Sequence, residues 1–175
     1  YTTQLLEYDT KMEVGDITKN KKKIESIKDK SSFDYLIRKA KLEDHKGNLD
    51  GAITLMELAF DKVKNKTSGL YCWALSNLGD MYGHAGRVEE SYHAYLNVLR
   101  KDSGYIYALK GIAWIAFSND HNTKEAKRIY QFILSQTDMP DLYLNLAEIA
   151  EWEGDSQKKM EYIGRFIRQV EMPGY

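Results

Sequence analysis

Apolar residues recur along this chain at the spacing of an α-helix. Leu75, Leu78 and Tyr82 fall on one face of a helix, and the segment 88–99 carries a second apolar stripe. Between the two stripes lies Gly86, a residue that readily adopts the positive φ at which helices end. The chain has only two prolines and no long alternation of apolar and polar residues, which argues against a β protein. The pattern therefore predicts a helical hairpin that turns at Gly86.

The same turn signal recurs along the chain. A glycine, a polar residue and an aliphatic residue follow one another at Gly15, Gly47 and Gly86, and Gly154-Asp155 repeats the first half of that step. A period of about 34 residues places the missing member near residue 120, where the run Asn119–Asn122 is a helix breaker with one extra residue. Met139-Pro140 and Met172-Pro173 recur at about the same period. Two independent markers thus predict a helical repeat.

These markers divide the chain into a single run of repeats, with no second domain. The expected repeats cover approximately residues 1–32, 33–66, 72–103, 106–139 and 140–171. Residues 172–175 read as the start of a further repeat that is cut short, which suggests a window from a longer array.

Several helix starts carry capping signals. Ser31-x-x-Asp34 and Asn122-x-x-Glu125 resemble capping boxes, in which a side-chain oxygen accepts a backbone N–H of the first helical turn. Asp138 is expected to cap the helix that Pro140 opens, and Ser156 to cap the helix after Gly154.

The repeat that begins at Cys72 resembles the tetratricopeptide repeat family, a 34-residue helix-turn-helix unit. It carries that family's pattern at Leu75, Leu78, Gly79, Tyr82, Gly86, Ser91 and Tyr95. The small residues at 79 and 91 are expected where the two helices of a hairpin cross closely. Lys39, Glu43 and Lys159 depart from the pattern, since they stand at positions where the family has apolar or small residues.

The resemblance implies an all-α fold, with antiparallel helical hairpins stacked in a right-handed superhelix, and a role as a protein-binding scaffold. The wording of block 78–87 is also similar to repeat proteins of Bacteroidetes-type bacteria, some of them cell-envelope proteins. That likeness favours the bacterial cell envelope without excluding the cytoplasm.

The family's inner helices line a concave groove, and its groove positions can be read onto this chain. Aromatic side chains between charges are typical of binding hot spots. The expected groove residues are Trp73, Ser76, Asn77, Asp80, His84, Tyr107, Lys110, Trp114, Glu148 and Trp152. Trp114 and Phe117 could instead pack between successive repeats, and the sequence does not choose between the two.

Composition narrows the kinds of partner. The chain has 25 Lys plus Arg against 26 Asp plus Glu, so it lacks the positive excess of a nucleic-acid-binding protein. No stretch approaches the roughly 18 apolar residues of a membrane span. Cys72 is the only cysteine, which excludes an intrachain disulfide and any multi-cysteine metal site.

No catalytic motif is convincing. Ser156-x-x-Lys159 matches an acyl-enzyme motif in form, but that motif's partner sequences are missing. His45 and His84 occupy the same position in adjacent repeats, which leaves a metal-dependent enzyme as a remote alternative. We expect no enzyme, cofactor or metal, and a protein or peptide as the partner. The main alternative is a structural segment of a longer cell-envelope protein, whose groove is filled by flanking parts of its own chain.

Overall fold

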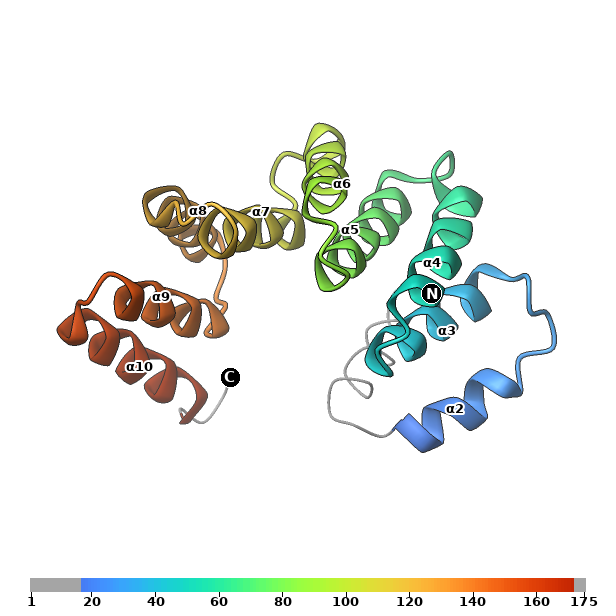
Figure 1. Cartoon of the computed structure of the whole chain (residues 1–175), viewed down its shortest axis with the longest axis horizontal. Coiled ribbons are helices and arrows are strands. Elements are labelled where there is room, and N and C mark those ends of the chain that lie inside the picture. The colour runs from blue at the N-terminus through green and yellow to red at the C-terminus, as the bar shows by residue number, and fades with distance from the viewer. Residues whose placement is uncertain (1–16, 172–175) are drawn as a thin grey trace. The chain divides into compact units, whose positions relative to one another are not determined.

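The computed structural model describes residues 17–171, and every regular element in that range is an α-helix. The predicted all-α class is therefore confirmed for this part of the chain. The helices are α2 (Ile17–Glu25), α3 (Phe33–His45), α4 (Leu49–Val63), α5 (Ser68–His84), α6 (Val88–Lys101), α7 (Ile106–Ser118), α8 (Thr123–Gln136), α9 (Asp141–Trp152) and α10 (Ser156–Glu171) (Figure 1). Helix α5 begins four residues before the expected repeat start at Cys72. The expected features at Gly15 and at residues 172–175 lie outside the described range.

Glycines with positive φ end three of the helices. Their φ angles are 82° at Gly47, 75° at Gly86 and 76° at Gly154, a region that glycine enters without steric cost. After Gly86 the N–H of Arg87 donates to the carbonyl oxygen of Tyr82 at 2.8 Å, which satisfies one of the carbonyls left open at the end of α5. The predicted turns at these three glycines are confirmed. They join α3 to α4, α5 to α6 and α9 to α10, each a pair of helices that pack together.

The turn between α7 and α8 is longer by one residue, as the sequence indicates. Here His121 takes the left-handed conformation, with φ of 52°. The N–H of Asn122 donates to the carbonyl oxygen of Ala116 at 2.7 Å, and its side chain accepts the N–H of Glu125 at 3.1 Å. Asn122 is thus the predicted cap of α8.

The other predicted caps are wrong by a few residues. Ser32, not Ser31, caps α3 by accepting the N–H of Tyr35 at 3.2 Å, while the Ser31 hydroxyl donates to Asp29 at 2.6 Å. The predicted cap at Ser31 is thus one residue too early.

Two further helix starts also differ from expectation. Pro140 itself precedes α9, and no side chain caps that helix, so Asp138 has no capping role. At α10 the cap is Asp155, which accepts the N–H of Lys158 at 3.0 Å, and Ser156 is the first helical residue. A carboxylate at this place is also favoured by the helix dipole.

Helices α5 and α6 cross where small residues are predicted. The hydroxyl of buried Ser91 donates to the carbonyl oxygen of Gly79 at 2.7 Å. A Cβ at Gly79 would lie only 2.7 Å from the ring of Tyr95, which is buried and donates its hydroxyl to Asp80. Nearby in α5, Cys72 is also buried, at 1% exposure. The expected close approach is confirmed.

Two charged residues stand on α3 where apolar ones are expected, and they satisfy each other. Lys39 and Glu43 form an ion pair of 2.9 Å one turn apart, and Glu43 also accepts the side-chain N–H of Asn48 at 2.8 Å. These bonds lower the pKa of Glu43 and raise that of Lys39. Helix α3 therefore remains helical although it carries two partly buried charges.

The chain forms two compact units, residues 1–103 (unit 1) and 104–175 (unit 2). In unit 2 the core is a cluster from α7, α8 and α9, against which the half-buried Tyr162 of α10 packs; its buried residues are Ala113, Ala116, Phe117, Ala126, Ile129, Tyr130, Ile133, Leu142, Leu146 and Ile149. Within residues 17–171, no helix combines the length and apolarity that crossing a membrane demands.

Candidate functional site

Unit 2 exposes large aromatic side chains on α7 and α9. The exposed fractions are 54% for Tyr107, 46% for Trp114 and 59% for Trp152. Burying an indole or phenol ring removes apolar surface from water and is favourable in free energy, so large rings that stay half exposed are candidates for contact with a partner. We define the aromatic patch as Tyr107, Trp114, Phe117, His121 and Trp152.

Ring contacts hold the centre of this patch in place. Phe117 is buried at 8% exposure and packs edge-on against both indoles, with centroid distances of 6.3 Å to Trp114 and 6.3 Å to Trp152. Of the two residues for which the sequence leaves the groove and packing between repeats open, Trp114 is half exposed and Phe117 is buried in the core of unit 2. Phe117 serves as a rigid base for two exposed indoles.

His121 is the member of the patch that sequence reasoning missed. Its ring stacks on Trp152 with a centroid distance of 4.7 Å and an interplanar angle of 8°. The left-handed backbone of the α7–α8 turn places it there. The sequence marks the turn but contains no signal for the direction of this side chain.

Charged residues accompany the indoles at helical spacing. Lys110 precedes Trp114 by four residues on α7, and Glu148 precedes Trp152 by four residues on α9. Residues four apart share a helix face, so both charges lie beside the aromatic patch. Lys110 is half-buried and Glu148 is exposed.

In unit 1 the expected groove residue Trp73 is partly covered. Its ring packs edge-on against Phe33 at 6.2 Å, and the Lys41 ammonium lies over it at 5.7 Å. The side-chain amide of Asn77 donates to the Trp73 carbonyl oxygen at 2.8 Å, within the same helix. Trp73 and Asn77 therefore contact other groups of unit 1 and are less open to a partner than the exposed indoles of unit 2.

Two other expected groove residues in α5 differ in exposure. Ser76 is buried at 3% exposure, so it faces the interior and not an open groove. Asp80 is exposed but accepts the hydroxyl of Tyr95, which ties its carboxylate to α6.

His84 pairs with a carboxylate and not with His45. Its Nδ1 lies 3.0 Å from the Asp44 carboxylate, which links α5 to α3. The hydrogen bond with Asp44 is the main cause of a raised pKa for His84, and the charge of Asp80 adds to it. In the described part of the chain, no three side chains of the His, Cys, Asp and Glu types gather as metal ligands would.

No family model matches this chain, and no curated protein sequence matches it. Among solved structures, the fold of this chain is similar to that in the crystal structure of BtubC (BKLC) from P. vanneervenii. The TM-score is 0.66 at 17% sequence identity, over 96% of this chain and 79% of that chain. At this identity the likeness concerns the fold alone.

Proposed function

We propose that this chain is a protein-binding module of the tetratricopeptide-repeat type, and that it grips a peptide or protein segment on the aromatic patch. The observation that carries the proposal is the pair of exposed indoles, Trp114 and Trp152, fixed on the buried ring of Phe117. The role is binding and not catalysis.

The patch has the physical properties of a binding hot spot. Tryptophan and tyrosine bury a large area while losing few rotatable bonds, and they dominate the energy of many interfaces. The contacts of Trp152 with Phe117 and His121 hold its ring before a partner arrives. Less ordering entropy is then lost on binding. Lys110 and Glu148 supply opposite charges beside the indoles, where they can orient a bound segment.

The repeat character rests on features within the hairpins. The glycine turns recur after α3, α5 and α9, and Gly79 meets Ser91 at the α5–α6 crossing. The tetratricopeptide resemblance and a stacked, superhelical arrangement belong to this proposal.

A displayed library of random peptides, panned against the full chain, tests the role. Recovered peptides are then measured by calorimetry against the parent, Trp152→Ala and Trp114→Ala. We expect each variant to weaken binding at least about ten-fold, since hot-spot truncations cost about 2 kcal/mol or more. Circular dichroism should remain that of the parent, because both indoles are about half exposed.

Phe132→Ala is the matched control. Phe132 is another exposed aromatic residue of unit 2, at 47% exposure, but it lies on α8 and outside the aromatic patch. Its loss should change affinity less than two-fold. Peptides that bind the Trp152→Ala variant as tightly as the parent, or a library that yields no binder, would refute the proposal.

A further inference from the structure

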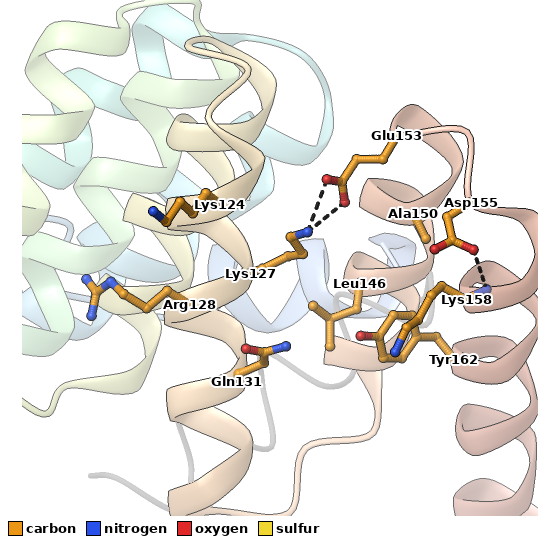
Figure 2. A pocket seen from close by; sticks show the side chains of 10 residues that line it. All are labelled: Lys124, Lys127, Arg128, Gln131, Leu146, Ala150, Glu153, Asp155, Lys158 and Tyr162. Atoms are coloured by element: carbon orange, nitrogen blue, oxygen red, sulfur yellow. Dashed lines mark hydrogen bonds and ion pairs between the residues drawn. The ribbon is translucent and has the colours of Figure 1, made fainter.

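Unit 2 presents two surfaces that a ligand could contact, the aromatic patch and a pocket of about 440 Å³ between α8, α9 and α10 (Figure 2). Both carboxylates of the pocket are engaged, since Glu153 pairs with Lys127 at 2.9 Å and Asp155 accepts the N–H of Lys158 at 3.0 Å. No residue of the aromatic patch lines the pocket. The aromatic patch defines the chemistry of a ligand more closely, because several of its polar groups have no partner in the protein.

The aromatic patch contains three hydrogen-bond donors that the protein itself does not use. They are the indole N–H groups of Trp114 and Trp152 and the hydroxyl of Tyr107, which form no hydrogen bond within residues 17–171. Each donor belongs to a ring that is about half exposed. The charges of Lys110 and Glu148 beside the indoles are opposite and cancel. The patch is therefore complementary to an uncharged ligand that offers both apolar surface and hydrogen-bond acceptors.

Two of the rings lie on one face of α7. Tyr107 and Trp114 are seven residues apart, which places them about 20° apart around the helix and about 10.5 Å apart along its axis. Gly111 lies between them on the same face, so α7 itself places no side chain between the two rings. A ligand that contacts both rings therefore needs anchoring groups that recur at a spacing of about 10 Å.

This spacing discriminates between peptide conformations. An extended strand places side chains of one face at intervals of about 6.6 or 13.2 Å, and neither interval fits. A polyproline II helix repeats every three residues, or about 9.3 Å, and its backbone carbonyl groups have no internal hydrogen bonds. An α-helical ligand matches the spacing over seven residues, but its carbonyl groups are bonded within the helix and leave the donors of the patch unused. The polyproline II conformation thus fits both the rings and the donors.

The size of the patch suits a short and stiff segment. A fully buried aromatic side chain contributes about 200 Å², so the three half-exposed rings offer about 300 Å². A stable interface between two proteins takes about 800 Å² from each partner, so the patch is too small to hold a second copy of this chain. A polyproline II segment is ordered before it binds and loses little conformational entropy, which favours it on a small contact area.

We propose that the aromatic patch binds a proline-rich segment in the polyproline II conformation. Prolines three residues apart stack on the rings of Tyr107 and Trp114, and carbonyl groups of the ligand accept hydrogen bonds from the phenol O–H and the indole N–H. This inference rests on the proposed binding function and adds the class of ligand to it.

Fluorescence anisotropy on the full chain tests the ligand class. The probe is a fluorescein-labelled oligoproline of about nine residues, and the reference peptide has alanine in place of every proline. We expect the alanine peptide to bind at least about ten-fold more weakly, since it lacks the stacking rings and the stiff conformation. In the nuclear magnetic resonance spectrum, the indole N–H signal of Trp114 should shift with oligoproline, whereas that of Trp73 in unit 1 should not.

Tyr107→Phe tests the hydrogen bond separately from the ring. The variant keeps the aromatic surface and removes the hydroxyl, so oligoproline should bind about five-fold more weakly, as the loss of one hydrogen bond predicts. Tyr92→Phe is the matched control, because Tyr92 is an exposed tyrosine of unit 1 outside the aromatic patch. It should change the affinity less than two-fold, and both variants should keep the circular dichroism of the parent.

Three results would overturn the ligand class: an alanine peptide that binds as tightly as oligoproline, a Tyr107→Phe variant that binds like the parent, or a Trp114 signal that does not move at saturation. If oligoproline does not bind while library peptides do so through Trp114 and Trp152, the proline-rich class fails and the proposed function stands. If neither oligoproline nor any library peptide binds, both fail.

Discussion

The His84–Asp44 ion pair gives unit 1 a pH-dependent contact between α5 and α3. Because Asp44 raises the pKa of His84, the folded state holds the proton more tightly than the unfolded chain does. The stabilisation is complete below the unfolded pKa of about 6.5 and is lost as the pH rises through the higher folded pKa. His84 is 58% exposed, so solvent screening limits the gain to about 0.5 kcal/mol.

Urea unfolding at pH 5.5 and 8.5 checks this prediction. His84→Gln should destabilise the protein at pH 5.5 and have little effect at pH 8.5. In an Asp44→Asn background the same change should have no pH-dependent effect, since the carboxylate that holds the proton is gone. An equal effect of His84→Gln at both pH values would contradict the assignment.

At the residue level, the sequence predicts which side chains have the chemistry of a binding site, but not the direction in which each one points. Tyr107, Trp114 and Trp152 are predicted as binding residues, and they are exposed as a binding surface requires. Ser76 is predicted for the same surface but is buried. A shift of one position around a helix decides whether a side chain is exposed or buried. That shift depends on packing against neighbouring helices, which the repeat pattern does not describe. His121 depends on a left-handed turn residue, which no periodicity encodes.

At the level of the helix pair, Gly79 is required by the close approach of α6. Gly79→Ala gains about 1 kcal/mol of helix propensity. The new Cβ, however, meets the ring of Tyr95 at 2.7 Å, and that ring is buried and bonded to Asp80, so it cannot move away freely. Overpacking of this kind costs about 1–3 kcal/mol, so we expect a net loss of about 1 kcal/mol in a thermal or urea melt.

Gly83→Ala in the same helix is the control. A Cβ there would lie 3.4 Å from the Ser91 hydroxyl, close to an ordinary van der Waals distance. The variant should be neutral or more stable by up to about 1 kcal/mol. If Gly79→Ala were as stable as Gly83→Ala, the tight crossing would be wrong.

Helix ends show why turns are easier to predict than helix starts. Gly47, Gly86 and Gly154 end helices because few other residues adopt positive φ at low cost, so the residue type is nearly sufficient. A helix start has several candidate oxygens within two or three residues, and local hydrogen bonds choose between them. Ser31 and Ser32 both offer such an oxygen and both hydroxyls donate to Asp29, but it is Ser32 that accepts the N–H of Tyr35.

For the whole molecule, the periodic pattern predicts the all-helical class and the three glycine turns. Its origin is simple: a two-helix unit must bury one face of each helix, so the apolar positions recur with the unit. The pattern does not reveal that residues 1–103 and 104–175 form separate compact units, nor the pocket that α8, α9 and α10 form in unit 2. The pocket arises from polar positions of three helices, including Lys127 and Lys158, and a hydrophobic period says nothing about them.

The rate at which Cys72 is labelled can be used to measure how often unit 1 opens. It is the only thiol in the chain, it is 1% exposed in α5, and burial raises its pKa. A disulfide reagent can react only after α5 separates from its neighbours, so the labelling rate is a kinetic reporter of that opening. We expect labelling of the native protein to be at least about 100-fold slower than in guanidinium, and Gly79→Ala to accelerate it while Trp152→Ala, in unit 2, does not. Fast labelling of the native parent would mean that the α5–α6 hairpin opens without unfolding.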